Sequence, residues 1–376
     1  MRRSERGFTL IELMVALVVS SLLVGMILAI FNRMSIAYRG QQQIAGVQQV
    51  LAAARATIEL DAKQAGLELS QGFRYAGDAG TPTVPRSAVR VTDSAVGPDT
   101  IGFYYADPTI QAAVTGGAFP TVSLDQATGF ALGDLVVLSK VDTTTTGINA
   151  GEANIATYEA CLLRITAVQL SPAQMTFDTN APWGRPTEDH CKDAPAAGMM
   201  IYKFVAHAYR IDTSTPAQAA LGPLQLSPFG GLTGTAADAW TPLAYGFTDI
   251  QTALQLYDTF EPGGGTDTAD PDVDADREWY SGNDQTLLTQ PGATLQPRDG
   301  FLQMSISLVA RTDRDVEGIS TAATPALIDA ARPDNNSLGN HPSVALPAAG
   351  DPALQGSRIY RYTTFVVDLR NLGVGR

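Results

Sequence analysis

A run of 19 uncharged residues near the N-terminus, Leu13–Phe31, limits the fold of this chain more than any other feature. As a helix that rises about 1.5 Å per residue, this run nearly crosses a hydrocarbon core about 30 Å thick. The segment before it, residues 1–7, is short and basic, with three arginines. Because basic flanks stay on the cytoplasmic side of a membrane, we expect a single span with the rest of the chain on the opposite side.

The helical pattern continues beyond the apolar run. Five apolar residues recur at alternating spacings of three and four: Ile44, Val47, Leu51, Ala54 and Ile58. This spacing places them in one stripe along a helix, with polar residues on the other faces. The sequence therefore predicts one helix from about residue 8 to about residue 66. Its transmembrane part, residues 8–31, is apolar all round, and its continuation, residues 32–70, is amphipathic.

The remaining residues, 71–376, predict a β-rich head. Candidate strands are residues 100–107, 134–140, 160–168, 174–179, 199–211, 250–258, 301–312 and 359–369. Several of these alternate apolar and polar residues, which is typical of a half-buried antiparallel sheet. Segments rich in glycine and proline predict long loops: residues 76–99, 213–242, 260–300 and 317–357. The expected fold class is α+β, with an antiparallel sheet packed on the second half of the long helix.

Two of the candidate strands show which of their faces should be buried. In residues 301–312 the alternation puts three apolar residues on one face: Met304, Ile306 and Leu308. In residues 359–369 two apolar residues, Phe365 and Val367, point to one side. The opposite face of that strand carries Tyr360, Tyr362, Thr364, Val366 and Asp368.

The charge distribution excludes nucleic acid as a partner. The whole chain has a formal net charge of −13, with 25 Lys and Arg against 38 Asp and Glu. Residues 1–70 hold seven basic and five acidic residues, so the remainder holds 18 basic and 33 acidic, a balance of −15. Phosphate binding needs a basic face, which this acidic chain lacks.

The sequence contains no serine-nucleophile elbow, zinc-protease motif or paired-cysteine motif. It therefore predicts no enzyme and no catalytic residues.

The densest acidic segment has aspartate at alternate positions, Asp270, Asp272, Asp274 and Asp276. Oxygen ligands at alternate positions begin the calcium loops of proteins. The match to an EF-hand is incomplete, because Ala275 stands at the glycine position and a serine at the final glutamate position. Two interpretations stay open, a calcium site and a solvated acidic loop. No other cofactor is expected.

Residues 7–13, GFTLIEL, resemble the cleavage and methylation signature of type IV prepilins. The signature combines a basic leader, a glycine, an aromatic residue, a glutamate four positions later and an uninterrupted apolar helix. The resemblance implies that a prepilin peptidase removes leader residues 1–7 by cutting between Gly7 and Phe8. It also implies N-methylation of Phe8 and assembly of the helices into the core of a filament.

Further pieces of the chain resemble the PilW family of minor pilins and, more distantly, the J-type pseudopilins of type II secretion. They are residues 58–66, 133–140, 301–312 and 360–372. The resemblance implies a role in pilus assembly at or near the filament tip, as part of an initiation complex. A J-type pseudopilin is the alternative. A membrane-anchored enzyme or receptor is a third reading, from a different class.

The resemblance to pilins also implies partners and a location. The partners are other minor and major pilins, the prepilin peptidase, the inner-membrane assembly platform, a tip adhesin and, before assembly, membrane lipid. The location is a single pass through the inner membrane with the head in the periplasm, followed by the pilus and the cell surface.

Glu12 would be the acidic residue that pilins bury within their apolar helix. A carboxylate at the centre of a bilayer costs about 2.5–3.5 kcal/mol on insertion scales, so it needs a partner. After cleavage the nearest cation is the new amine of Phe8, on the same chain or on a neighbouring one. The alternative is that Glu12 lies close enough to the interface to reach water.

The two cysteines, Cys161 and Cys191, should face an oxidising compartment, where thiols form disulfides. A bridge between them would close a loop of about 30 residues and stabilise the head by about 3–4 kcal/mol on the chain-entropy model. The alternative is two free thiols.

Overall fold

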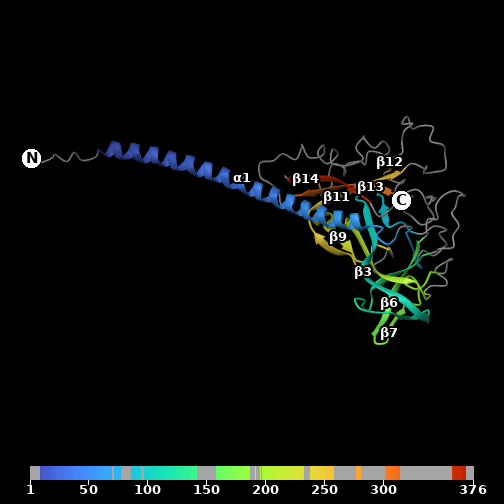
Figure 1. Ribbon diagram of the computed structural model, residues 1–376. Coiled ribbons are helices and arrows are strands. Elements are labelled where there is room, and N and C mark those ends of the chain that lie inside the picture. The colour runs from blue at the N-terminus through green and yellow to red at the C-terminus, as the bar shows by residue number, and fades with distance from the viewer. Residues whose placement is uncertain are drawn as a thin grey trace, which may run out of the picture.

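The structure of the protein, a computed structural model, consists of one long helix and a β-rich head (Figure 1). It describes residues 9–69, 72–77, 86–94, 97–141, 158–186, 191, 195, 197–232, 238–257, 277–280, 301–313 and 358–369. The helix, α1 (Leu10–Gln64), has 55 residues. Its first half projects away from the head, and its second half lies along it (Figure 1). The antiparallel sheets of the head and the long helix give the α+β fold that the sequence predicts.

The second half of α1 buries the apolar stripe that the sequence predicts. Val47, Leu51, Ala54 and Ile58 are all buried, and Ile44 is half-buried at the membrane-proximal end of the stripe. Beyond Ile58 the stripe continues with two more buried residues, Asp61 and Ala62. The helix ends where Ala65 leaves the helical conformation and its N–H donates to the carbonyl of Asp61.

The head contains fourteen described strands and one short helix. Their bounds are β1 (Phe73–Arg74), β2 (Val89–Thr92), β3 (Thr100–Ala118), β4 (Thr121–Leu124), β5 (Leu135–Val141), β6 (Tyr158–Leu170), β7 (Ala173–Phe177), β8 (Met200–Ile211), α2 (Pro216–Leu221), β9 (Leu224–Ser227), β10 (Thr241–Ala244), β11 (Phe247–Tyr257), β12 (Arg277–Tyr280), β13 (Phe301–Arg311) and β14 (Tyr360–Asp368). Ten of these strands form one sheet, and β12, β11, β13 and β14 form a second sheet in that order.

Six strands of the larger sheet pair in a closed ring. The order is β8–β5–β6–β7–β4–β3, and β3 returns to pair with β8. All of these pairings are antiparallel. The long strand β3 takes part in both sides of the ring, and its register with β8 shifts between Asp107 and Gln111. Closure leaves these six strands fewer open edges.

The head has two hydrophobic cores. The first lies between α1 and the inner faces of both sheets, and it includes Ile58, Phe103, Tyr209 and Ile306. The second is made by the strands of the closed ring and includes Val114, Leu163, Met175 and Ile201. Strands β6 and β7 of the ring lie far from the axis of α1 (Figure 1). The first core therefore fixes the helix to the head, and the second stabilises a lobe at its side.

The face predictions for β13 and β14 are largely correct. Met304, Ile306 and Leu308 are fully buried in the first core, and so are Phe365 and Val367 of β14. The opposite face of β14 is exposed except at Tyr360, which is buried beside its register partner Arg311. The second face of β13 is also buried along most of the strand, at Ser305, Ser307, Val309 and Arg311.

The prediction of four long loops is wrong in three places. Residues 76–99 contain β2, residues 213–242 contain α2 and β9 and the beginning of β10, and residues 260–300 contain β12. The missed strands have only four residues each, too few for a clear alternation. The helix α2 is six residues long and is stabilised by its ends rather than by an apolar stripe. The fourth predicted loop, residues 317–357, lies outside the described residues.

Candidate functional site

The start of α1 is closed by a reciprocal hydrogen-bonded cap. Thr9 is the N-cap residue, and its backbone N–H donates to Oε2 of Glu12 at 3.0 Å. The Thr9 hydroxyl donates to the same oxygen at 2.9 Å, and the N–H of Glu12 donates to the Thr9 hydroxyl at 3.3 Å. This capping box satisfies two backbone donors that the first turn of a helix leaves without partners. The Glu12 carboxylate is thereby turned back toward the N-terminal end of the chain.

Gly7 and Phe8, the two residues of the expected cleavage site, lie outside the described residues. The carboxylate of Glu12 nevertheless reaches the backbone of Thr9, which directly follows Phe8 in the chain. A new amine at Phe8 would therefore be separated from Glu12 by four residues, slightly more than one helical turn of sequence. The pairing of Glu12 with that amine stays a prediction.

The first half of α1 exposes a continuous apolar surface. Its large apolar side chains between Leu10 and Phe31 are 50–79% exposed. Among the described residues this is the one helix long and apolar enough to cross a membrane. Exposed apolar surface of this extent is typical of a site that contacts lipid or other proteins. No described part of the chain covers this surface, so we expect lipid or other proteins to do so.

A buried polar cluster attaches the end of α1 to the ten-stranded sheet. Asp61 is only 5% exposed, and its carboxylate accepts a hydrogen bond from the hydroxyl of Tyr105 on β3 at 3.2 Å. On β8, the hydroxyl of Tyr209 donates to the other carboxylate oxygen, and Nδ1 of His207 lies 2.8 Å from it. Burial, reinforced by the charge of Asp61, raises the pKa of both tyrosines. Both hydroxyls therefore remain protonated donors, and the cluster fixes how the helix meets the head.

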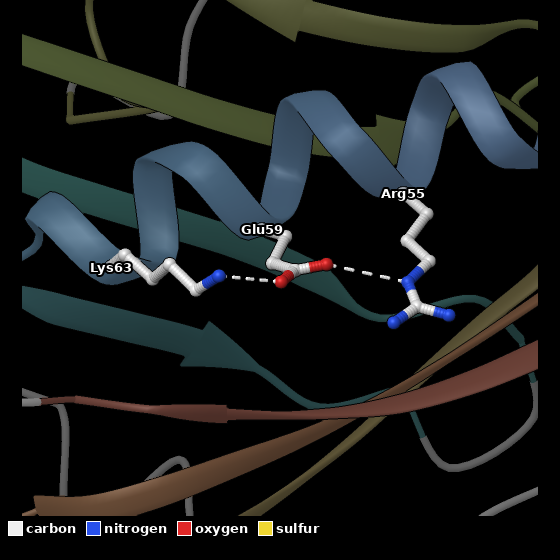
Figure 2. Close-up of polar contacts among 3 residues, drawn as sticks. All are labelled: Arg55, Glu59 and Lys63. Carbon is white, nitrogen blue, oxygen red and sulfur yellow. Dashed lines mark hydrogen bonds and ion pairs between the residues drawn. The ribbon is translucent and has the colours of Figure 1, made fainter.

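The solvent-facing side of the same helix carries a row of charges. Figure 2 shows Glu59 between Lys63 and Arg55, with distances of 2.6 Å and 3.3 Å. The hydrogen bond from Lys63 and then that from Arg55 lower the pKa of Glu59. The Arg55 guanidinium also lies 5.1 Å from the centre of the Phe365 ring on β14. Exposed ion pairs at this spacing contribute little to stability, so the row orients side chains on the surface and does not hold the fold.

A disulfide joins Cys161 of β6 to Cys191, with a Cα–Cα distance of 5.7 Å. Both cysteines are buried in the second core, inside the ring of strands. The bridge therefore ties the segment that carries Cys191 to the interior of the side lobe.

The expected calcium ligands, Asp270, Asp272, Asp274 and Asp276, lie outside the described residues. Within the described ranges, no group of three or more His, Cys, Asp or Glu side chains is arranged to hold a metal ion.

Sequence reasoning missed the Asp61 cluster. A detectable sign was present, because Asp61 lies three residues after Ile58 and so falls within the apolar stripe of the helix. A carboxylate at a core position of an amphipathic helix needs buried donors. The donors, Tyr105, His207 and Tyr209, come from strands about 40 to 150 residues further along the chain, and no local pattern indicates them.

Comparison with known proteins gives one family match and one structural match. The family model for the prokaryotic N-terminal methylation motif matches residues 2–28. Among solved structures, the type IV-like pilin TTHA1219 from Thermus thermophilus aligns with 15% identity over 65% of this chain and 87% of that chain. The TM-score of 0.22 is too low to establish a shared arrangement of strands. No curated protein matches the sequence.

The chain thus has a methylation motif like that of prepilins, followed by a long apolar helix and a head of antiparallel sheets, an arrangement similar to that of type IV pilin-like proteins. The apolar helix and the signal also fit anchoring in a membrane before assembly.

Proposed function

We propose that this protein is a minor pilin of the PilW type that takes part in assembly of a type IV pilus at or near the filament tip. The observation that carries the proposal is the uncovered apolar half of α1 directly behind the prepilin signal. Lipid covers this surface before assembly, and the helices of neighbouring pilins cover it afterwards. Helix packing in either setting requires no change in the docked second half of α1.

Processing prepares the helix for assembly. A prepilin peptidase cuts between Gly7 and Phe8, and the new N-terminus at Phe8 is methylated. The carboxylate of Glu12, already turned toward that end of the helix, pairs with the amine of the same chain in the membrane. In the filament it pairs with the amine of a neighbour instead. An unpaired charge in hydrocarbon is costly, so this exchange favours docking at the axial step that brings the two groups together.

The shape of the head supports a terminal position. The closed ring of strands extends to the side of α1, away from the helix axis (Figure 1). A subunit repeated along a shaft must pack its head against heads directly above and below it. A lobe of this size at the side of the helix would clash with the heads of subunits above and below it in a shaft. A subunit at the tip has no subunit above it, so the lobe fits there.

The membrane orientation follows from the same proposal. The basic leader stays in the cytoplasm, α1 crosses the inner membrane once, and the head folds in the periplasm. The Cys161–Cys191 disulfide supports this placement, because structural disulfides persist in oxidising compartments.

The test is the location and abundance of the processed protein. Sheared filaments should contain it at a small fraction of the major pilin, and antibodies to the head should label filament ends. The inner-membrane fraction should contain it bound to other minor pilins and to the assembly platform. Labelling along the whole shaft would contradict a tip position. Recovery with type II secretion components, and not with pili, would favour the J-type pseudopilin instead.

A further inference from the structure

A hollow of about 410 Å³ lies on the ten-stranded sheet, on the face turned away from α1. Successive side chains of a strand point to opposite faces. Tyr105, His207 and Tyr209 face Asp61 on the helix, so Gly102, Ala208 and Arg210 face the hollow. The site thus belongs to neither the helix surface nor the polar cluster described above.

The floor of the hollow is made by small residues. The strand registers place Arg90, Gly102 and Ala208 side by side across β2, β3 and β8. Two neighbouring positions on this row therefore carry almost no side chain. A Cβ atom at Gly102 would lie 2.8 Å from the Tyr104 hydroxyl. That hydroxyl donates to the carbonyl of Gly230 at 2.7 Å and so holds the turn that forms one wall.

Two fixed guanidinium groups stand at the edges of this floor. Nη1 of Arg90 donates to the carbonyl of Gly231 at 3.0 Å, and the Arg90 side chain also hydrogen-bonds with Tyr104. Arg210 lies 4.2 Å from the centre of the Trp240 ring, and its Nε donates to Gln225 at 2.9 Å. These contacts within the chain hold both guanidinium groups in place at the hollow.

The charged side chains that line the hollow are Arg90, Arg210 and Asp238, which together carry one net positive charge. The rest of the head is acidic, so a polyanion would be repelled at long range. A planar guanidinium matches the geometry of a carboxylate. Trp240 adds ring surface, and Thr92 and Thr100 of the lining can bind hydroxyl groups. The volume is in the range of small-molecule sites.

We propose that this hollow binds a hydroxylated monocarboxylate, the chemistry of a uronic acid, either free or as the single acidic unit of an otherwise neutral glycan. The arginines hold the carboxylate, and Trp240 and the two threonines contact the sugar ring. The proposal does not depend on the position of the protein in a filament.

Calorimetric titration of the full-length protein in detergent tests this, with sodium glucuronate as the probe. Glucose lacks the carboxylate and acetate lacks the hydroxylated ring, so each should bind at least tenfold more weakly. Arg210→Gln should weaken glucuronate binding at least tenfold, and Arg210→Lys should weaken it less, because it keeps the charge and loses the planar fork. The matched control Arg55→Gln removes the same charge from an exposed arginine on α1 and should change nothing.

The melting temperature of each variant shows that it is folded before binding is compared. Tighter binding of a glucuronate-containing disaccharide than of the monosaccharide would assign the site to a glycan, and the reverse order would assign it to the free sugar acid. No binding of glucuronate to folded wild-type protein would overturn the proposal. Equal binding by wild type and Arg210→Gln, or by glucose or acetate and glucuronate, would overturn it as well.

Discussion

At the scale of single residues, Glu12 is the group whose chemistry differs most from its surroundings. It lies at the beginning of an apolar helix and is held by Thr9. Glu12→Gln keeps its shape and removes its charge, so leader cleavage should continue. Recovery of the processed protein in sheared filaments should fall about tenfold, which corresponds to a loss of about 1.4 kcal/mol in docking free energy.

Glu59→Gln is the matched control, because Glu59 is a carboxylate on the surface of the docked half of the same helix. Its removal should leave both processing and incorporation unchanged. Normal incorporation of Glu12→Gln would mean that Glu12 does not guide assembly in this protein. That result would favour the alternative in which Glu12 contacts water at the membrane interface.

Asp61 should matter for stability and not for processing. Asp61→Ala removes the acceptor for two tyrosine hydroxyls and a histidine nitrogen, all at the buried contact of α1 with the sheet. Because hydrogen bonds to charged groups contribute more than neutral ones, we expect the free energy of unfolding to fall by about 3 kcal/mol. Denaturant titration of the detergent-solubilised protein measures this loss. Glu59→Ala should cost much less, and equal losses would show that the cluster is not a specific attachment.

Asp99 should make stability depend on pH. It is fully buried and accepts hydrogen bonds from Ser94 and from the backbone and hydroxyl of Thr252. Burial, and then the charge of Asp93, raise its pKa well above the ordinary value. The folded state therefore holds this proton to higher pH than the unfolded chain does. The stabilisation is complete below the ordinary aspartate pKa of about 3.9 and is lost as the pH rises through the raised value.

Asp99→Asn cannot ionise, so its melting temperature should fall less than that of the wild type as the pH rises from 4 to 8. The amide oxygen can still accept from Thr252, which keeps the variant folded. Parallel curves for the two proteins would show that Asp99 does not titrate in this range.

At the scale of elements, the disulfide should control the side lobe. It closes a loop of about 30 residues inside the second core, so its loss should destabilise the head by about 3–4 kcal/mol. For a head of this size we expect a melting temperature about 10 °C lower. The chain has two cysteines in total, so reduction of the wild type and the double variant Cys161→Ala, Cys191→Ala should agree. No change on reduction would contradict a stabilising role.

The long helix and the main strands could be predicted because their patterns are local. The spacing of the apolar residues from Val47 to Ile58 predicts the buried stripe directly. Strands β5, β8 and β13 are long enough for their strand-like composition to be recognised. The first half of β3 was also predicted, but the strand continues past Pro108 through a shift of register to Ala118. A proline argues against a regular strand, so that continuation could not be predicted from pattern alone.

The shorter elements depend on contacts or on end signals. Strand β9 is defined by its pairing with β8 and β10, which only the fold brings beside it. For α2 a local sign existed, because Thr215 caps the start, Pro216 occupies the first turn and Gly222 ends the helix with φ +58. These are the residues that favour those positions. The Gly/Pro-rich composition of residues 213–242 nevertheless led to the prediction of a loop, despite these capping signals.

At the scale of the whole molecule, the two halves of α1 have different roles. The second half is covered by the head's own strands, and the first half has no cover from the described part of the chain. The same long element therefore holds the head in place and presents an apolar rod to lipid or to other helices. Cleavage between Gly7 and Phe8, as proposed from the methylation motif, would leave this rod on the mature protein.

Mass spectrometry of the N-terminus of the protein extracted from membranes tests this account most directly. We predict a mature chain that begins at an N-methylated Phe8, with residues 1–7 absent and the apolar helix intact. A Gly7 variant with a bulky side chain should retain the leader, because the peptidase must accommodate a residue without a side chain there. A mature N-terminus beyond residue 31 would mean that the apolar segment is an ordinary cleaved signal, and it would contradict the pilin-like account.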